Sequence, residues 1–137
     1  MTRARSFRSW GSWLALAAIV SASACESSRY DRVELHRTGG HPEAEIAPGG
    51  LTVPEGGVLV FRAQPRAEVA SPEYEGLERF KLTPSDPSVA TAHRAILRDT
   101  WVVSGMSIGS TQLLVIVDGD VVDEVPVEIV APEEVGQ

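Results

Sequence analysis

The 137-residue sequence contains one cysteine, Cys25, which excludes a disulfide within the chain. A folded domain built from it must therefore rely on buried apolar side chains. Long apolar runs are also lacking. The longest extends from about Trp10 to Val20, well short of the roughly 20 residues that a membrane-spanning helix needs. The sequence therefore predicts no spanning helix.

Residues 1–24 have the layout of an export signal. Arg3, Arg5 and Arg8 form a basic start, the apolar run follows, and small residues lead up to Cys25. This order of basic, apolar and small residues is typical of a signal peptide that is removed after export. We therefore expect the mature protein to begin near Cys25.

Three outcomes of processing fit residues 22–25. The run Ala22-Ser23-Ala24-Cys25 resembles a bacterial lipobox, with Ala22 where leucine is usual, and this resemblance implies lipidation of Cys25. Ordinary cleavage would instead leave a free N-terminal thiol, and an uncleaved amphipathic anchor is the third reading. Lipidation is the expected outcome because it accounts for the lone cysteine, and several acyl chains are enough for stable anchoring. Within this resemblance, Glu26 implies a lipoprotein of the cell envelope at the outer membrane.

The mature chain is strongly acidic. Removal of the signal leaves 9 basic residues against 19 acidic ones, a net charge of −10. Such a surface disfavours nucleic acid and anionic lipid head groups as partners. We expect no nucleic-acid binding and a monomer.

Composition divides the mature chain into three parts. Residues 25–45 are charged and interrupted by Gly39-Gly40 and Pro42, which predicts a flexible linker that lifts the domain off the membrane. A short strand containing Tyr30, Val33 and Leu35 is the alternative. Residues 46–131 contain short Val-, Ile- and Thr-rich runs between turn residues, which is typical of an all-β sandwich or barrel. Residues 132–137 form a tail.

Two stretches of the domain show the period of two expected of strands. Residues 58–63 and 125–129 alternate apolar and other side chains. Between the runs 113–117 and 121–127, Asp118-Gly119 predicts a type I′ hairpin, because both central residues need positive φ. Pro126 cannot donate a ladder hydrogen bond, so the last strand should lie at an edge there or carry a bulge.

The spacing of four short strings is similar to that of the bacterial Ig-like domain, group 2, known from invasin- and intimin-like adhesins. The strings are Ser85-Asp86-Pro87-Ser88-Val89-Ala90-Thr91-Ala92, Val103-Ser104-Gly105-Met106, Gly109-Ser110-Thr111-Gln112-Leu113 and Val125-Pro126-Val127-Glu128-Ile129. The resemblance implies an Ig-like Greek-key β-sandwich of about seven short strands. Leu82 stands where the family usually has a tryptophan, and Trp101 is expected to replace that aromatic volume in the core. Independently, the carboxylate of Asp86 is expected to accept a backbone N–H two residues on.

Catalytic and metal motifs are weak. Residues 105–109 match G-x-S-x-G, but that motif needs a strand–turn–helix context and a histidine after the serine, whereas the last histidine is His93. His36 and His41 have no nearby partner ligand, and the acidic residues around Asp118 lack the D-x-D-x-D-G order of a calcium loop. We expect no enzyme activity, no cofactor and no metal.

A long acidic connection, Gln64–Arg79, is the candidate binding region, because long irregular loops are disproportionately functional. Tyr74, Glu75 and Leu77 are its candidate contact residues, with Arg98 brought alongside if the topology is Ig-like. A tyrosine among carboxylates suits a basic protein or a glycan. The apolar row of Leu114 and Ile116 is a second possible docking surface.

These features predict a non-enzymatic, lipid-anchored envelope protein whose Ig-like domain serves as a binding, scaffold or spacer module. The alternative is a periplasmic inhibitor or ligand-binding protein that uses the loops at one end of the sandwich. The partner would be an envelope protein or glycan.

Overall fold

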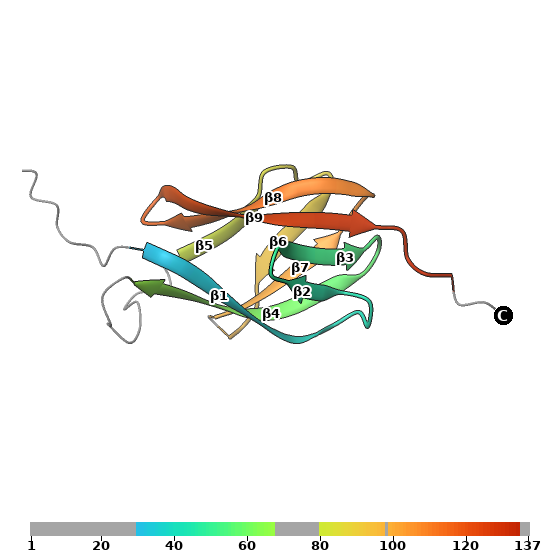
Figure 1. The fold of residues 1–137 in the computed structure, drawn as a ribbon, viewed down its shortest axis with the longest axis horizontal. Coiled ribbons are helices and arrows are strands. Elements are labelled where there is room, and N and C mark those ends of the chain that lie inside the picture. The colour runs from blue at the N-terminus through green and yellow to red at the C-terminus, as the bar shows by residue number, and fades with distance from the viewer. Residues whose placement is uncertain (1–29, 68–79, 98, 135–137) are drawn as a thin grey trace, which may run out of the picture.

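A computed structural model describes residues 30–67, 80–97 and 99–134. In this part of the chain all regular structure is β, arranged as two packed sheets (Figure 1). No described helix is long and apolar enough to cross a bilayer. The prediction of an all-β sandwich is confirmed.

The first sheet is antiparallel and has four strands. Its order is β1 (Tyr30–Gly40), β4 (Val58–Ala67), β7 (Thr100–Gly105) and β6 (Ala90–Arg94). The second sheet has five strands. Its order is β2 (Glu45–Ala47), β3 (Gly50–Pro54), β9 (Asp120–Val130), β8 (Gly109–Val117) and β5 (Phe80–Pro84). Only the β3–β9 pair is parallel among the described pairs.

The strand order is that of an Ig-like sandwich. β1-β4-β7-β6 corresponds to the A-B-E-D sheet, and β5-β8-β9 to the C-F-G sheet. The chain changes sheets five times, after β1, β3, β4, β5 and β7, and the last three of these changes give the Greek-key connection. The described residues form nine strands rather than about seven, because β2 and β3 extend the second sheet beyond β9.

The core lies between the sheets and follows the predicted alternation. Leu59, Phe61 and Ala63 are fully buried, and so are Val127 and Ile129. Trp101 is only 4% exposed, and its ring meets Phe80 edge-on with centroids 6.2 Å apart. Such a T-shaped pair adds stabilisation beyond its buried area. Trp101 thus supplies aromatic volume to the core, as expected.

The β8–β9 hairpin forms at the predicted place. Asp118 has φ 54° and Gly119 has φ 85°. Two successive positive φ values are the requirement of a type I′ turn, whose twist matches that of the flanking strands. The hairpin prediction is confirmed.

The linker prediction for residues 25–45 is wrong for its described part. Residues 30–40 form β1, which pairs with β4 from Tyr30↔Ala67 to Gly40↔Leu59. Val33 and Leu35 pack against the core while their polar neighbours face outward. The polar composition belongs to an edge strand, which needs apolar residues on one face only.

Pro126 lies at the beginning of the β3–β9 ladder, with Gly50 of β3 packed against it. Pairing with β3 begins one residue later, at Leu51↔Val127. The carbonyl of Val130 accepts a hydrogen bond from Glu55 N, so it faces β3. Because the direction of the backbone groups alternates along a strand, the position of the N–H that Pro126 lacks also faces β3. β9 is internal to the sheet, so the predicted edge or bulge at Pro126 is not found; the proline instead lies at the beginning of the β3 ladder.

Candidate functional site

The five residues predicted as sites lie outside the described part of the chain. They are Cys25, Tyr74, Glu75, Leu77 and Arg98. The predicted loop Gln64–Arg79 is partly wrong, because residues 64–67 belong to β4 and Pro65 is buried opposite Val33. The remaining described surface can be divided into the two ends of the sandwich.

We call one end the hairpin end. It contains the start of β1 and the β8–β9 turn (Figure 1). The described residues of the β6–β7 turn (95–97 and 99) lie on the same half of the sandwich but further back along β4, because Thr100 pairs with Arg62 while Tyr30 pairs with Ala67. The opposite end, the platform end, contains the turns of residues 55–57, 85–89 and 106–108. β7 connects the two, because it begins after the 95–99 turn and finishes before the 106–108 turn.

The platform end is held together by backbone hydrogen bonds between turns that are distant in sequence. Gly56 N donates to Gly105 O at 2.9 Å, and Gly105 N donates to Gly57 O at 3.0 Å. Met106 N donates to Val89 O at 2.8 Å. These bonds fix the 106–108 turn against both of its neighbours, so its backbone is already ordered before any partner arrives.

Close packing adds to these bonds at Gly105. A Cβ at this position would lie 2.6 Å from the carbonyl oxygen of Pro54. No side chain fits that gap, so glycine allows β7 to approach the end of β3. The first glycine of the G-x-S-x-G match is therefore a packing residue.

The Ser85–Val89 segment forms the third turn of the platform. Asp86 Oδ1 accepts Ser88 N at 3.0 Å and Ser88 Oγ at 2.6 Å, which is the predicted two-residue contact. These donors, the hydroxyl first, hold the pKa of Asp86 below its ordinary value. Thr111 Oγ1 accepts Asp86 N at 3.0 Å and ties the turn to β8.

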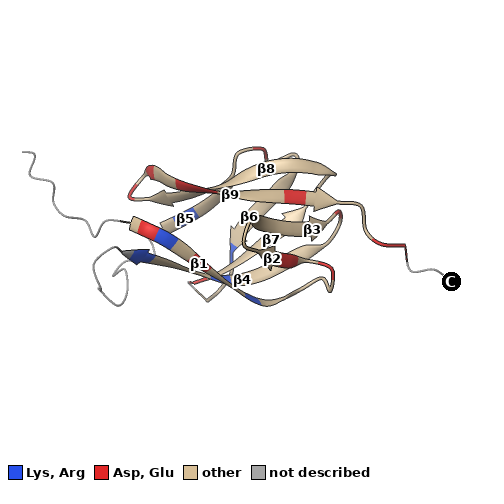
Figure 2. Ribbon diagram, in the orientation of Figure 1, with Lys and Arg blue, Asp and Glu red and all other residues tan. Residues whose placement is uncertain are grey.

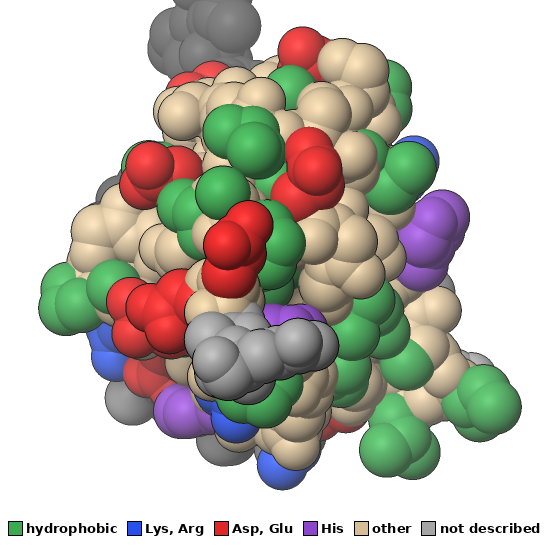
Figure 3. Space-filling model, turned by 90° about the vertical axis from the view of Figure 1, so that its right-hand side faces the viewer, with side chains coloured by type: hydrophobic (Ala, Val, Ile, Leu, Met, Phe, Trp, Pro, Cys, Tyr) green, Lys and Arg blue, Asp and Glu red, His purple; other side chains and the backbone are tan. Residues whose placement is uncertain are grey.

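Two aliphatic side chains project from this platform. Met106 is 53% exposed and Ile108 is 60% exposed, and Val58 nearby is 37% exposed. Ile108 N is bonded to Glu55 Oε2 at 3.1 Å, so a carboxylate lies beside the apolar pair. The three turns carry Glu55 and Asp86 and no lysine or arginine. Figure 3 looks onto this end and shows apolar and acidic side chains side by side.

This arrangement suits docking rather than catalysis. Ser107 lies between two strands, and its Oγ donates to Ser88 O at 2.7 Å, so its hydroxyl is used in holding the turns together. Among the described residues, no three His, Cys, Asp or Glu side chains are grouped to hold a metal ion. Exposed aliphatic side chains on a preordered turn can enter an apolar recess of a partner at little entropic cost.

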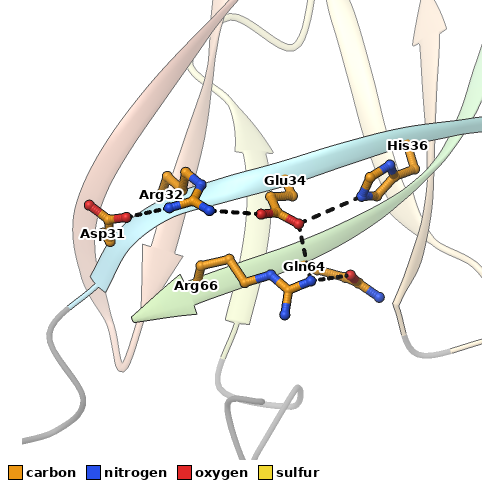
Figure 4. Close-up of polar contacts among 6 residues, drawn as sticks. All are labelled: Asp31, Arg32, Glu34, His36, Gln64 and Arg66. Carbon is orange, nitrogen blue, oxygen red and sulfur yellow. Dashed lines mark hydrogen bonds and ion pairs between the residues drawn. The ribbon is translucent and has the colours of Figure 1, made fainter. Parts of the chain in front are cut away.

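The hairpin end is held differently, by side-chain charges on β1 and β4 (Figure 4). Glu34 Oε2 lies 3.0 Å from Arg66 Nη2, and Glu34 Oε1 lies 3.0 Å from Arg32 Nη2. Asp31 pairs with Arg32 at 2.6 Å. The hydrogen bonds from Arg66 and then Arg32 lower the pKa of Glu34. Figure 2 shows basic residues on β1, β4 and β5 and acidic residues on β1 and the β8–β9 hairpin toward this end.

A groove of about 280 Å³ runs beside β1, between it and β9. Its floor includes Val33, Leu35 and Val125. Tyr30 Oη donates to Asp123 Oδ2 at 2.8 Å, and Asp123 Oδ1 accepts Glu124 N at 2.8 Å. The carboxylate of Asp123 thus bridges the two sheets and satisfies a backbone N–H on β9 next to its unpaired edge, which protects that edge from strand addition.

Sequence reasoning missed the platform end as a candidate site. The glycines at 105 and 109 marked a turn, and the residues between them were interpreted as turn residues only. The signal present was two large aliphatic residues, Met106 and Ile108, within a glycine-bracketed turn.

Comparison with known proteins identifies the fold and no family. No family model matches the chain, and no curated protein matches it. Among solved structures, domains 5–6 of the S-layer protein SbsC align with a TM-score of 0.55 and 18% identity, over 78% of this chain and 47% of that one. Domains 4 and 5 align with a TM-score of 0.50 and 19% identity, over 72% and 54%.

The longer SbsC fragment, domains 1–6, aligns with a TM-score of 0.52 and 17% identity, over 77% of this chain and 13% of that one. This chain therefore spans about half the length of the first two structures. At these identities the likeness concerns the fold. The resemblance to group 2 bacterial Ig-like domains rests on the residues quoted above.

Proposed function

We propose that the protein is a non-enzymatic, lipid-anchored component of the bacterial cell envelope, whose Ig-like domain binds a partner protein through the platform end. The anchor is Cys25, acylated after removal of residues 1–24. The partner surface is the apolar pair Met106 and Ile108 with the carboxylates around it.

The exposure of Met106 and Ile108 on a hydrogen-bonded turn carries this proposal. Isolated exposed aliphatic residues are common on protein surfaces. Here two of them share a turn whose backbone is fixed by bonds to Val89 and by the Glu55 carboxylate. The acidic surroundings favour a partner whose apolar recess has basic side chains at its rim. The sandwich also aligns with domains of an S-layer protein, and this likeness, together with the predicted export signal, supports an envelope location.

The binding proposal is tested by capture from envelope extract with the chain beginning at Cys25. Ile108→Glu should weaken a specific complex by roughly tenfold or more, as truncation of a central anchor does. The matched control is Ile96→Glu, the same change on the exposed β6–β7 turn, which should leave binding unchanged. Loss of the complex on Tyr74→Ala, with Ile108→Glu without effect, would overturn the platform assignment and favour the loop alternative.

The anchor is tested separately. Metabolic labelling with a fatty-acid analogue should mark the native protein and leave Cys25→Ser unlabelled. Equal labelling of the two would contradict the lipoprotein assignment without bearing on the platform.

A further inference from the structure

β1 begins only five residues after Cys25. Whatever their conformation, the residues from Cys25 to Tyr30 span at most about 18 Å. β9, an 11-residue strand that extends along the sandwich, is about 36 Å long at the usual rise of a strand. An anchor at Cys25 therefore holds the β1 end of the domain near the bilayer, and the tether is shorter than the domain itself.

The end that the tether holds is the hairpin end. Tyr30 pairs with Ala67 at the far end of β4 from the platform, and its hydroxyl bonds to Asp123 near the β8–β9 turn. Figure 1 shows the start of β1 and the β8–β9 hairpin together at one extremity, opposite the described C-terminal residues.

Exposed aliphatic side chains occur at this end as well. Ile96 is 102% exposed and Leu97 is 69% exposed, both in the β6–β7 turn. Val121 and Val122, directly after the β8–β9 turn, are 53% and 39% exposed. Four large apolar side chains therefore emerge from two turns on the half of the sandwich that the tether holds, with the β6–β7 turn set back along β4 near Arg62.

We propose that the hairpin end contacts the lipid bilayer, with Ile96 and Leu97 entering its interface. This inference rests on the proposed acylation of Cys25. The short tether favours the bilayer as the partner of these side chains, because a five-residue connection keeps them near the lipid surface at a high effective concentration. Acyl chains and an apolar protein surface then act together as membrane signals. The platform end, across the length of β7, points away from the bilayer toward a partner.

Tryptophan quenching by brominated lipids tests this orientation. The chain from Cys25 keeps every strand of the sandwich, and its single native tryptophan, Trp101, is buried and gives a constant background. Coupling of Cys25 to a maleimide-headed lipid in uncharged phosphatidylcholine vesicles anchors the domain independently of cellular processing. Ile96→Trp and Ile108→Trp are matched probes, since both replace an exposed isoleucine in a turn.

The expected result is loss of most of the added Ile96→Trp fluorescence with brominated lipids and no loss for Ile108→Trp. Adding Leu97→Glu to the Ile96→Trp variant should restore the signal while the coupled domain stays on the vesicles. Equal quenching of both probes, or of neither, would overturn the inference. An Ile96→Trp emission that shifts to the blue without quenching would also overturn it, since the turn would then contact protein.

A mass measurement on the protein produced in bacteria separates this inference from the function it rests on. Acylated Cys25 with an unquenched Ile96→Trp probe refutes the orientation and keeps the lipoprotein assignment. Unmodified Cys25 with a quenched probe in the coupled system refutes the lipoprotein assignment and supports the membrane contact of this end.

Discussion

The two ends of the sandwich are stabilised by different interactions. At the platform end, turns distant in sequence share backbone hydrogen bonds, and Gly105 permits contact that no side chain would allow. At the hairpin end, Arg32, Glu34 and Arg66 form an exposed ion-pair network on two strands. Backbone bonds between packed turns are insensitive to salt, whereas exposed ion pairs are screened. The platform end should therefore be less sensitive to salt than the hairpin end.

The largest difference in stability between the two ends is expected when one glycine at each end is replaced by alanine. Gly105→Ala forces a Cβ against Pro54 O, and we expect it to lower the free energy of unfolding by about 3 kcal/mol, at the upper end of overpacking costs. Gly119→Ala meets no atom within 4 Å and costs only the strain of positive φ, about 1 kcal/mol. Urea denaturation measures both. Equal effects would show that the platform is not the more tightly packed end.

A second comparison concerns the bridge between the sheets at the hairpin end. Asp123→Ala removes the acceptor of both Tyr30 Oη and Glu124 N, and should cost about 2 kcal/mol. Tyr30→Phe removes one of these bonds and should cost about 1 kcal/mol or less. Only Asp123→Ala uncovers the β9 edge, so it alone should increase self-association in analytical ultracentrifugation. A dimer formed equally by Tyr30→Phe would contradict the protective role of the carboxylate.

Acid should loosen both ends, and salt only one. The folded pKa values of Glu34 and Asp86 are lowered, so each carboxylate stabilises the fold above its unfolded pKa near 4. That contribution is lost as the pH falls through the lowered values. High salt weakens the Arg32–Glu34–Arg66 network but not the neutral Ser88 donors to Asp86. Amide hydrogen exchange should therefore rise in salt at His36, which is opposite Arg62 in the β1–β4 ladder, and stay constant at Met106.

Variants at the same sites identify the groups responsible. Glu34→Gln should abolish the salt effect on His36 exchange, and Asp86→Asn should leave that effect intact. Persistence of the salt effect in Glu34→Gln would assign it to another interaction at the hairpin end.

The smallest effects are expected at the exposed aliphatic residues. Ile96→Ser and Ile108→Ser should each change the free energy of unfolding by less than about 0.5 kcal/mol, because neither side chain is buried by the fold. Thermal denaturation compares them. A clear loss of stability for Ile108→Ser would mean that this residue packs against the platform and is not free for a partner.

The features predicted correctly from the sequence are those determined by neighbouring residues. The φ requirements of Asp118-Gly119 fix the hairpin locally, and the Asp86 side chain reaches only two residues along the chain. Alternation revealed the strand at Leu59–Ala63 because one of its faces is wholly apolar.

The features that were missed depend on contacts between distant residues. β1 contains only Val33 and Leu35 as clear inward positions, and its partner β4 lies some thirty residues away. Gly39-Gly40 made the segment resemble a linker. The platform site was missed because the exposure of Ile108 depends on Glu55 and Val89, which no local pattern links to it.

The parallel pairing of β3 with β9 has a consequence for how the chain acquires its structure. Leu51 must find Val127 near the C-terminus before the second sheet is complete, and contacts so far apart in sequence form slowly. Until the last strand has been synthesised, the sandwich lacks an internal strand of that sheet. A chain still being made would thus expose the edges of β3 and β8 that β9 later covers.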